Sequence, residues 1–334
     1  MSHFLHKIAS ANSGVVSPNN FAALWVPFAD AGSGVASTQL ARGTGSITVT
    51  RAGATAWTRN SSGAWIGPIA ANTLRSYYSP AGVYQGALIE EQRTNHFLNS
   101  AAPVTQTSGA LALGSYTLWM EGTGSVAVAG NTATITGAGT ASAGVPVTFT
   151  VTVAGTVNYT VTGTPTIVQS ENGAMATSYI QTAGAAVTRN ADIPLVPSAG
   201  NVSGTAGTCA AIVSCASFAS APRMVTLSDT LERPALFANG GTNIAIFDGV
   251  TIVNGPLVGA VNVPTRYASR WSGSVMQAAS NGVNGTAGVF DGNMDVGTNI
   301  GIGFSPPSGL PINGTIRNLR IWTTDLGASV LPTL

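Results

Sequence analysis

The sequence predicts an all-β protein in which a loop-rich N-terminal region precedes two antiparallel β-sandwiches. Apolar and polar residues alternate along many short stretches, and Asn-Gly, Asp-Gly and Gly-Gly pairs separate those stretches. No segment sustains apolar residues at helical spacing. Successive side chains of a strand point to opposite faces, so an alternation of period two is typical of half-buried strands. A chain of 334 residues is long enough for two or three domains.

The composition excludes several classes of protein. Charged residues make up 7% of the chain, where about 25% is usual in soluble domains. Hydrophobic residues reach 44% and the formal net charge is +1, which argues against disorder and leaves no electrostatic basis for binding nucleic acid. Lys7 is the single lysine, so almost all basic groups are arginines, whose planar guanidinium suits fixed hydrogen bonds. A surface with so little charge favours an obligate assembly.

The N-terminal stretch MSHFLHKIASANSGVV lacks the apolar segment of a secretory signal peptide. No run in the sequence approaches the ~18 consecutive apolar residues of a membrane-spanning helix. We therefore expect synthesis in the cytoplasm and no membrane insertion.

The first expected unit is residues 1–98. It contains aromatic pieces such as FAALWVPFA and SYYSPAGVYQGALIEE but little regular alternation. We expect it to be poor in strands, rich in loops and dependent on neighbouring chains to complete its core.

The second expected unit is a small sandwich over residues 99–195. Alternation in VTFTVTV (147–153) and in VNYTV (157–161), with Ala154-Gly155 between them, predicts a hairpin. Gly130-Asn131 lies between two further short alternating stretches and predicts a second tight hairpin.

The third expected unit is a larger sandwich over residues 196–334, because short strands and turn signals alternate there at the spacing of such folds. The expected strands are CAAIVSCASF, MVTLSD, ALFANGG, NIAIFDG, GAVNV, YASRWSG, SVMQAASNG, NIGIGF and TIRNLRIW. Cys209 and Cys215 share the first of these strands and would lie about 20 Å apart, too far for a disulfide. We expect two buried free thiols.

Three segments together resemble a recurrent arrangement in bacteriophage virion proteins of the head-spike, fibre and tail-fibre type. They are VTRAGATAWTRNSSGAW (49–65), YYSPAGVYQGALIEEQRTNHFLNS (77–100) and MATSYIQTAGAAVTRNAD (175–192). The C-terminal INGTIRNLRIWTTDLGASVL resembles the closing strand of the concanavalin-A-like, or laminin-G-like, sandwich that ends those proteins. The matching residues in the three segments are Arg51, Glu90, Glu91, Arg93, Thr94, Asn95, Thr177, Ser178, Tyr179, Ile180, Thr188, Arg189 and Asp192.

The chain departs from that pattern in two places. Gln181 stands where the linker of the related proteins has proline, and the middle domain is shorter and rich in threonine and valine. The second departure argues against sugar binding by the middle domain.

The resemblance implies a structural protein on the exterior of the virion, either a capsid decoration or head fibre or a tail fibre. Residues 1–98 would attach to capsid or tail proteins, the C-terminal sandwich would be concanavalin-A-like, and the chain would form a homotrimer. It implies no enzymatic activity and offers host surface glycans as a further ligand. A glycan-degrading tailspike and a free carbohydrate-binding lectin are the alternatives.

Glu90, Glu91 and Arg93 stand close together in a chain with few charges, and the resemblance places them at a domain junction. We expect Glu90 or Glu91 to pair with Arg93 or Arg189 in a buried interdomain clasp. Adjacent strand residues face opposite ways, so Glu90 and Glu91 do not suit a two-carboxylate hydrolase.

Two further candidate sites come from the C-terminal unit. The first would bind a glycan with an exposed ring beside polar groups, and its residues are Asp248, Asn254, Tyr267, Arg270 and Trp271. The alternative is that Trp271 and Trp322 are core residues. The second is a weak calcium site at Asp291, Asn293 and Asp295, although Val296 and Ile302 depart from the EF-hand pattern. The alternative is that these are turn-forming residues.

The three histidines support no catalytic assignment. His96 has no G-x-S-x-G serine to serve, so a catalytic triad is not expected. His3 and His6 could bind a metal on a shared axis of an oligomer, but the sequence shows no Cys or Glu beside them. Apart from the calcium candidate, no cofactor is expected.

Overall fold

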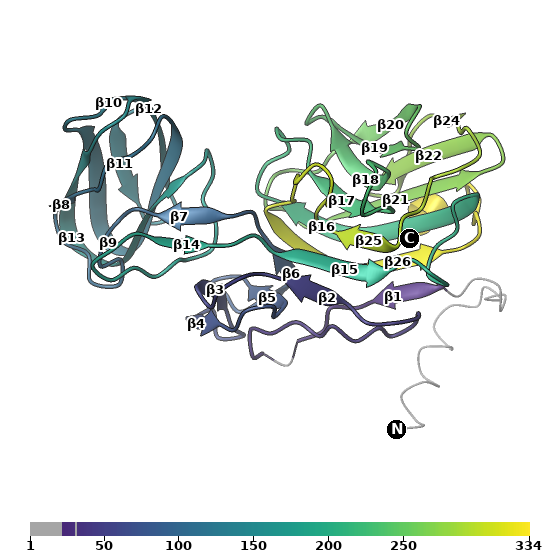
Figure 1. Cartoon of the computed structure of the whole chain (residues 1–334), viewed down its shortest axis with the longest axis horizontal. Coiled ribbons are helices and arrows are strands. Elements are labelled where there is room, and N and C mark those ends of the chain that lie inside the picture. The colour runs from purple at the N-terminus through teal and green to yellow at the C-terminus, as the bar shows by residue number, and fades with distance from the viewer. Residues whose placement is uncertain (1–21, 31) are drawn as a thin grey trace.

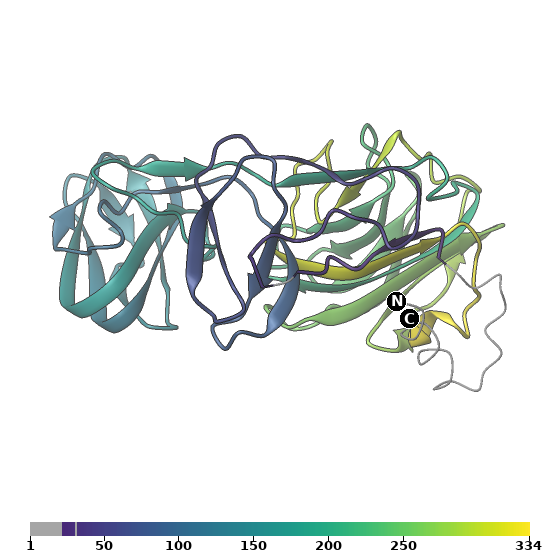
Figure 2. The same ribbon diagram turned by 90° about the horizontal axis from the view of Figure 1, so that it is seen from below.

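The computed structural model describes residues 22–30 and 32–334 and confirms the all-β prediction. These residues form four antiparallel sheets and, apart from the short 3-10 helix η2 (Leu331–Thr333), contain no helix. Figures 1 and 2 show an elongated molecule with a small lobe at one end, a large lobe at the other and the N-terminal strands along one side. Within the described ranges no helix is long and apolar enough to cross a membrane.

The large lobe is a sandwich of two sheets. Its nine-stranded sheet contains β1 (Leu24–Val26), β5 (Arg75–Tyr78), β6 (Tyr84–Ile89), β16 (Ala206–Cys215), β21 (Thr265–Ser272), β22 (Val275–Ser280), β23 (Val283–Asn284), β24 (Gly288–Val289) and β26 (Gly314–Trp322). Its seven-stranded sheet contains β2 (Thr48–Thr50), β15 (Ile193–Pro197), β17 (Arg223–Thr226), β18 (Pro234–Asn239), β19 (Asn243–Phe247), β20 (Ile252–Leu257) and β25 (Asn299–Ile302).

Strands from the first hundred residues extend both sheets of the large lobe. Strand β6 pairs with β26, and β5 pairs with β6, while β1 pairs with another part of β26. Strand β2 pairs with β15 at the edge of the other sheet. We expected this region to complete its core against neighbouring chains. Instead, Leu24, Val26 and Ile89 are buried in the same core as Trp271 and Ile300 of the C-terminal strands.

Eight of the nine strands expected in the C-terminal unit correspond to strands of the structure. The exception is GAVNV, where residues 259–263 form no strand and the neighbouring residues 252–257 form β20. Gly255 and Pro256 lie inside β20 and hid it from a reading of alternation alone. Cys209 and Cys215 are buried free thiols six residues apart on the central strand β16, as expected.

The small lobe is built on a long ribbon of two strands, β9 (Gly114–Gly130) and β13 (Val157–Asn172). The remaining strands of its eight-stranded sheet are β7 (Arg93–Asn95), β8 (Gln106–Thr107), β10 (Thr134–Thr136), β11 (Gly139–Ser142), β12 (Val147–Val153) and β14 (Val187–Arg189). Strands β11 and β12 pair with different halves of the same edge of β9. The sheet therefore curls around a second core that includes Phe97, Leu118 and Tyr159.

Both hairpins expected in this lobe are wrong. Strand β12 pairs with β9 and β10, and β13 pairs with β9, so β9 lies between the two strands that were expected to pair. Strand β10 likewise pairs with β12 rather than with its predecessor β9. The alternation correctly located the strands, but β12 and β13 do not pair with each other, and β10 does not pair with β9.

A separate two-stranded sheet, β3 (Ala56–Arg59) and β4 (Trp65–Ile69), lies beside the junction of the lobes (Figure 1). Strands β1, β2, β5 and β6 belong to the sheets of the large lobe. The proposed boundaries at residues 98 and 195 stay predictions.

Candidate functional site

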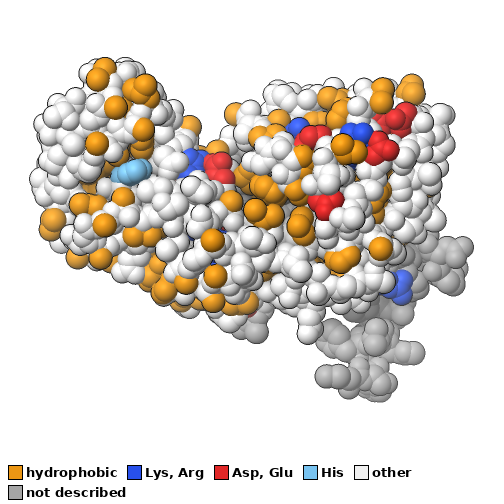
Figure 3. Space-filling view, in the orientation of Figure 1, with side chains coloured by type: hydrophobic (Ala, Val, Ile, Leu, Met, Phe, Trp, Pro, Cys, Tyr) orange, Lys and Arg blue, Asp and Glu red, His pale blue; other side chains and the backbone are white. Residues whose placement is uncertain are grey.

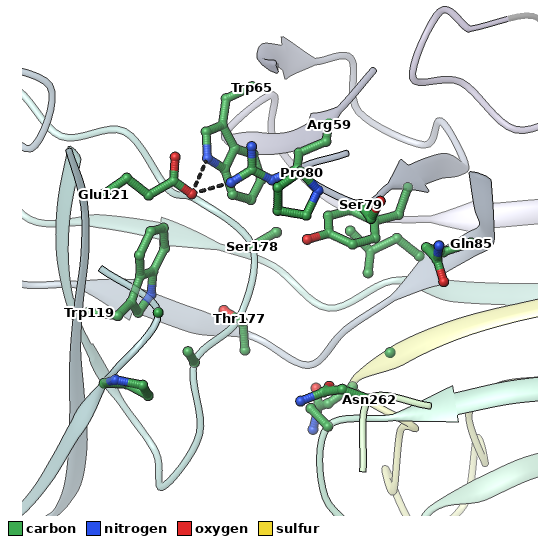
Figure 4. A pocket seen from close by; sticks show the side chains of 18 of the residues that line it. Arg59, Trp65, Ser79, Pro80, Gln85, Trp119, Glu121, Thr177, Ser178 and Asn262 are labelled. Atoms are coloured by element: carbon green, nitrogen blue, oxygen red, sulfur yellow. Dashed lines mark hydrogen bonds and ion pairs between the residues drawn. The ribbon is translucent and has the colours of Figure 1, made fainter. Parts of the chain in front are cut away.

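A pocket of about 820 Å³ opens at the junction of the two lobes. Its walls come from β4, β5 and β6 on one side, from β9 and the loop before β12 on the small lobe, and from the large lobe near Asn262 and Asn313. Figure 3 shows a molecule hollowed between its lobes and largely uncharged on the face in view. Figure 4 shows Trp119 and Asn262 reaching toward this space from opposite lobes.

Aromatic rings form one wall of the pocket. The ring of Trp65 on β4 lies 6.3 Å from that of Trp119 on β9 and 6.4 Å from that of Tyr77 on β5. Behind them, Tyr179 lies 6.0 Å from Trp65 and 6.4 Å from Trp119. Trp65 and Tyr77 are half-buried and line the pocket, so apolar ring surface is available to a ligand.

An arginine-carboxylate pair stands beside this wall (Figure 4). Trp65 donates its indole N–H to Oε1 of Glu121 at 3.0 Å, and the guanidinium of Arg59 donates to the same oxygen. The Arg59 guanidinium also lies 4.2 Å from the centre of the Trp65 ring. Indole, guanidinium and carboxylate are thus held in one fixed arrangement.

The turn between β3 and β4 positions Arg59 and Trp65. Asn60 accepts backbone N–H groups of Ser62 and Ala64 with its side-chain oxygen, each at 3.1 Å. Gly63 adopts a φ of +77°, and a β-carbon there would lie 2.1 Å from the carbonyl oxygen of Pro80. Only glycine suits that close approach, and its own carbonyl accepts a hydrogen bond from Arg59.

A buried ionic cluster lies beneath the pocket and connects the two lobes. We call it the arginine-carboxylate joint, and its members are Arg51, Arg75, Arg189, Glu90 and Asp192. Each is at most 4% exposed. Arg189 lies on β14 of the small lobe and Arg75 on β5 of the large lobe, so the joint links residues of both lobes.

The carboxylates of the joint are fully engaged. Glu90 lies 2.8 Å from Arg75 and 3.3 Å from Arg189, and it accepts the backbone N–H of Ser178 at 2.7 Å. Asp192 bridges Arg51 at 2.8 Å and Arg75 at 2.5 Å.

These contacts determine the protonation state of the buried carboxyl groups. Burial raises the pKa of Glu90, but Arg189, Arg75 and the hydrogen bonds from Ser178 outweigh it and lower the pKa to about 2. Glu171 is also buried, and burial raises its pKa despite hydrogen bonds from Thr177. Glu171 accepts the indole N–H of Trp119 at 3.1 Å, so this buried carboxyl group holds one ring of the aromatic wall.

The structure places the four residues expected in the interdomain clasp in two groups. Glu90 and Arg189 meet in the joint, whereas Glu91 and Arg93 form a separate ion pair with a half-buried carboxylate. Arg189 also donates to the backbone carbonyl of Glu91 at 2.8 Å. Whether this arrangement serves as the expected clasp stays a prediction.

Sequence reasoning missed part of the joint. Arg75 was not singled out, because nothing in its local sequence distinguishes it from the other arginines. Arg51 and Asp192 stood among the residues of the virion-protein resemblance, and that was the one available signal for them. The pocket residues Arg59, Trp65 and Glu121 were missed as a site, because their approach depends on how the lobes dock.

The five residues of the expected glycan site do not form an exposed set. Trp271 is fully buried, and Tyr267 is 1% exposed and accepts a hydrogen bond from the backbone of Gly259. Asp248 is buried, and its oxygens accept backbone N–H groups of a turn. Arg270 pairs with Asp325 at 2.8 Å. Asn254 is exposed but accepts a hydrogen bond from Asn239.

Trp271 and Trp322 are instead core residues, which was the alternative that the sequence offered. They are 0% and 4% exposed.

The expected calcium residues lie together on one loop. Asp291 accepts the backbone N–H of Asn293 at 2.9 Å, and Asn293 accepts that of Asp295 at 3.0 Å. Asp295 also pairs with Arg233 at 2.7 Å. These are the contacts of turn-forming side chains, and in the described ranges no group of three or more His, Cys, Asp or Glu residues could hold a metal ion.

The histidines have no catalytic surroundings that the structure describes. His96 packs its edge against Tyr116, and burial lowers its pKa. His3 and His6 lie outside the described residues. Burial raises the pKa of the Cys209 and Cys215 thiols far above its usual value, which makes both thiols inert.

No protein-family model and no curated protein matches the sequence. Among solved structures, the chain is similar to the CBM40 of Ruminococcus gnavus IT-sialidase bound to alpha2,3 sialyllactose. The identity is 13%, the match covers 39% of this chain and 82% of that one, and the TM-score is 0.34.

The chain is also similar to domain 4 of AbnA, a GH43 extracellular arabinanase from Geobacillus stearothermophilus, in complex with arabinotriose. The identity is 17%, the match covers 47% of this chain and 79% of that one, and the TM-score is 0.34. The NanB sialidase from Streptococcus pneumoniae is 13% identical over 42% of this chain and 26% of its own, with a TM-score of 0.32. Each of these likenesses is remote and covers less than half of the chain.

Proposed function

We propose that this chain is a non-catalytic glycan-binding protein displayed on the exterior of a bacteriophage particle, and that the saccharide binds in the pocket between the lobes. The observation that carries the glycan-binding part is the aromatic wall of Trp65, Trp119 and Tyr77 beside the Arg59–Glu121 pair. A ligand site combines apolar and aromatic surface with a few fixed polar groups, and this pocket has both.

The chemistry suits a sugar. The faces of pyranose rings carry C–H groups that pack on aromatic rings, and their edges carry hydroxyls that exchange hydrogen bonds with carboxylates, amides and hydroxyls. The pocket offers Glu121, Gln85 and Asn262 as such partners around its aromatic wall. Its volume of about 820 Å³ lies within the usual range of ligand pockets, which is about 300–1,000 Å³.

The carboxylates of the pocket do not suit glycoside hydrolysis. Among the residues that line the pocket, Glu90 and Glu121 are the two acids, and Glu90 is 4% exposed with its oxygens bound to arginines and Ser178. A carboxylate so engaged, with a pKa near 2, is not available as the proton donor that glycoside hydrolysis needs.

The virion setting rests on the sequence resemblance described above, and the surface is compatible with it. Exposed apolar side chains such as Val250, Leu257 and Val289 lie on the large lobe, and charged residues make up 7% of the chain. Such a surface favours contacts with further copies of the chain and with capsid or tail proteins. We propose a homotrimer that forms in the host cytoplasm and attaches through residues 1–98.

Binding is tested by screening the full chain against a glycan array and measuring the best ligand by calorimetry. Trp65→Ala should weaken that ligand at least about tenfold, which corresponds to about 1.4 kcal/mol. Trp25→Ala is the matched control, because Trp25 is an exposed tryptophan on β1 that does not line the pocket. Failure of every glycan to bind, or equal affinity of the two variants, would refute the assignment of the pocket.

Two further measurements address the rest of the proposal. The bound glycan should yield no new reducing ends on incubation, and their appearance would indicate a hydrolase. Mass spectrometry of purified particles should find the chain, with hundreds of copies for a capsid decoration and a few to a few dozen for a fibre. A chain that never co-purifies with particles would instead be a free lectin.

A further inference from the structure

The two charges beside the aromatic wall differ in how far they reach the solvent. The side chain of Glu121 is 33% exposed, whereas that of Arg59 is 9% exposed. The guanidinium of Arg59 is already committed to Glu121, to the carbonyl oxygen of Gly63 and to the face of Trp65. A ligand therefore meets the carboxylate of this pair rather than the guanidinium.

Glu121 retains an open acceptor. Its Oε1 accepts hydrogen bonds from Trp65 and Arg59, while Oε2 has no hydrogen-bond partner among the described residues. An ionised carboxylate accepts hydrogen bonds and cannot donate them, so Oε2 suits the hydroxyl of a ligand.

No other cation balances this carboxylate within the pocket. Of the residues that line it, Arg59 is the only basic one, and the remaining polar groups include the neutral side chains of Ser79, Gln85 and Asn262. The arginines of the joint lie beneath the lining residues and are occupied by Glu90 and Asp192. The charged group that a bound molecule meets first is therefore the carboxylate of Glu121.

We infer that the pocket selects uncharged saccharides over acidic ones, and that Glu121 is the residue that determines this specificity. The inference rests on the proposed function, because it concerns the ligand of the same pocket. A sialic or uronic acid carboxylate next to Glu121 would place two like charges together in a partly desolvated space. The hydroxyl of a neutral sugar would instead donate to Oε2.

Matched pairs of probes test the inference. Neutral hexose oligosaccharides and the same oligosaccharides oxidised at C6 to uronic acids differ in charge but hardly in shape. The affinity of the full chain for each pair is measured by calorimetry. The neutral member of the best pair should bind at least about tenfold more tightly than the acidic member. This ratio of affinities should shrink as the salt concentration rises from 50 to 500 mM, because the screening length then falls from about 14 Å to about 4 Å.

The variant Glu121→Gln removes the charge and keeps the shape. It should lower the ratio of neutral to acidic affinity to less than about threefold, with thermal unfolding recorded to show that the variant is folded. If the variant is unfolded, the salt dependence of the affinity ratio measured with the native chain tests the inference.

The outcomes separate the two proposals. Equal or tighter binding of the acidic member by the native chain, or a ratio that salt does not change, overturns the inference and leaves glycan binding in place. Binding of neither member of any pair overturns the proposed function and the inference with it.

Discussion

At the scale of single residues, the unusual feature is how the few charges of the chain are used. Three arginines and two carboxylates of the joint are buried where the lobes meet, although burying a charge costs free energy unless it is paired. Each carboxylate of the joint contacts two arginines. Four of the ion pairs in the described part of the chain thus form one buried group at the junction, while the pairs Arg223–Glu232, Arg233–Asp295 and Arg270–Asp325 lie within the large lobe.

Neutralising Glu90 should destabilise the protein strongly. Glu90→Gln leaves Arg189 without its carboxylate partner in a buried site and leaves Arg75 with Asp192 alone, so we expect a loss of about 3–5 kcal/mol in the free energy of unfolding. Glu91→Gln is the matched control, because that side chain is 36% exposed and its ion pair with Arg93 should contribute less than about 1 kcal/mol. Urea unfolding of the two variants measures both effects, and similar midpoints would contradict the structural role of the joint.

The same carboxylate predicts how stability depends on pH. Glu90 stays ionised in the folded chain down to a pKa of about 2, whereas in the unfolded chain it takes up a proton near 4.5. Between those values the unfolded state binds more protons, so stability falls as the pH falls from about 4.5 toward 2. Thermal unfolding across this range should show the loss.

The raised pKa of Glu171 acts in the opposite direction, with stability present at low pH and lost as pH rises. The contribution of Glu90 is therefore measured as the difference between the native chain and Glu90→Gln. A difference that does not change with pH would show that Glu90 is not held ionised.

At the scale of elements, the small lobe depends on bending one ribbon. Strands β9 and β13 pair over almost their full length, and the backbone adopts positive φ at Gly122, Gly124 and Gly163 near the middle. The register of β13 shifts between Pro165 and Ile167 at the same level. This bend lets one pair of strands contribute to both sides of a curled sheet.

Gly124→Ala should therefore damage the small lobe. Gly124 has a φ of +108°, and a β-carbon there would lie 2.1 Å from the carbonyl oxygen of Thr162 in the partner strand. We expect a loss of about 2 kcal/mol or more in the free energy of unfolding. Gly109→Ala is the control, since no atom lies within 4 Å of its added β-carbon. Equal stability of the two variants would contradict the role of the bend.

The two expected hairpins show that the sequence pattern predicts the positions of strands but not their pairing. The alternation in residues 147–153 and 157–161 located both strands, because it depends only on which side chains face the core. It carries no information about hydrogen-bonding partners, which are chosen by the burial of whole faces. The 17-residue strand β9 covers more of the core than either neighbour and so takes the place between them.

At the scale of the whole molecule, the first hundred residues and the C-terminal unit form one sandwich. Strands β1 and β6 both pair with β26, and their side chains Leu24, Val26 and Ile89 are fully buried in the shared core. Strands β3, β4 and β5 contribute Arg59, Trp65 and Tyr77 to the pocket at the junction of the lobes. Figure 4 shows Arg59 and Trp65 beside Glu121 of the small lobe.

A fragment of residues 196–334 should therefore not fold cooperatively. It lacks β1, β2, β5, β6 and β15, which leaves β25 and β26 as open edges and exposes the core beneath them. Circular dichroism during heating should show a broad transition, and limited proteolysis should degrade the fragment faster than the full chain. A sharp transition at the temperature of the full chain would show that the N-terminal strands add nothing to this sandwich.

The sequence by itself determined the all-β class and the positions of most strands in the C-terminal unit. It also indicated that Cys209 and Cys215 are buried free thiols and that charged residues cluster near Glu90. All of these follow from local patterns of polarity and spacing. Only the tertiary structure decided which strands pair, that the N-terminal strands complete the large sandwich, and that Arg59, Trp65 and Glu121 meet at one pocket. Those outcomes depend on contacts between segments far apart in the chain, where burial of whole faces outweighs the preferences of any short stretch.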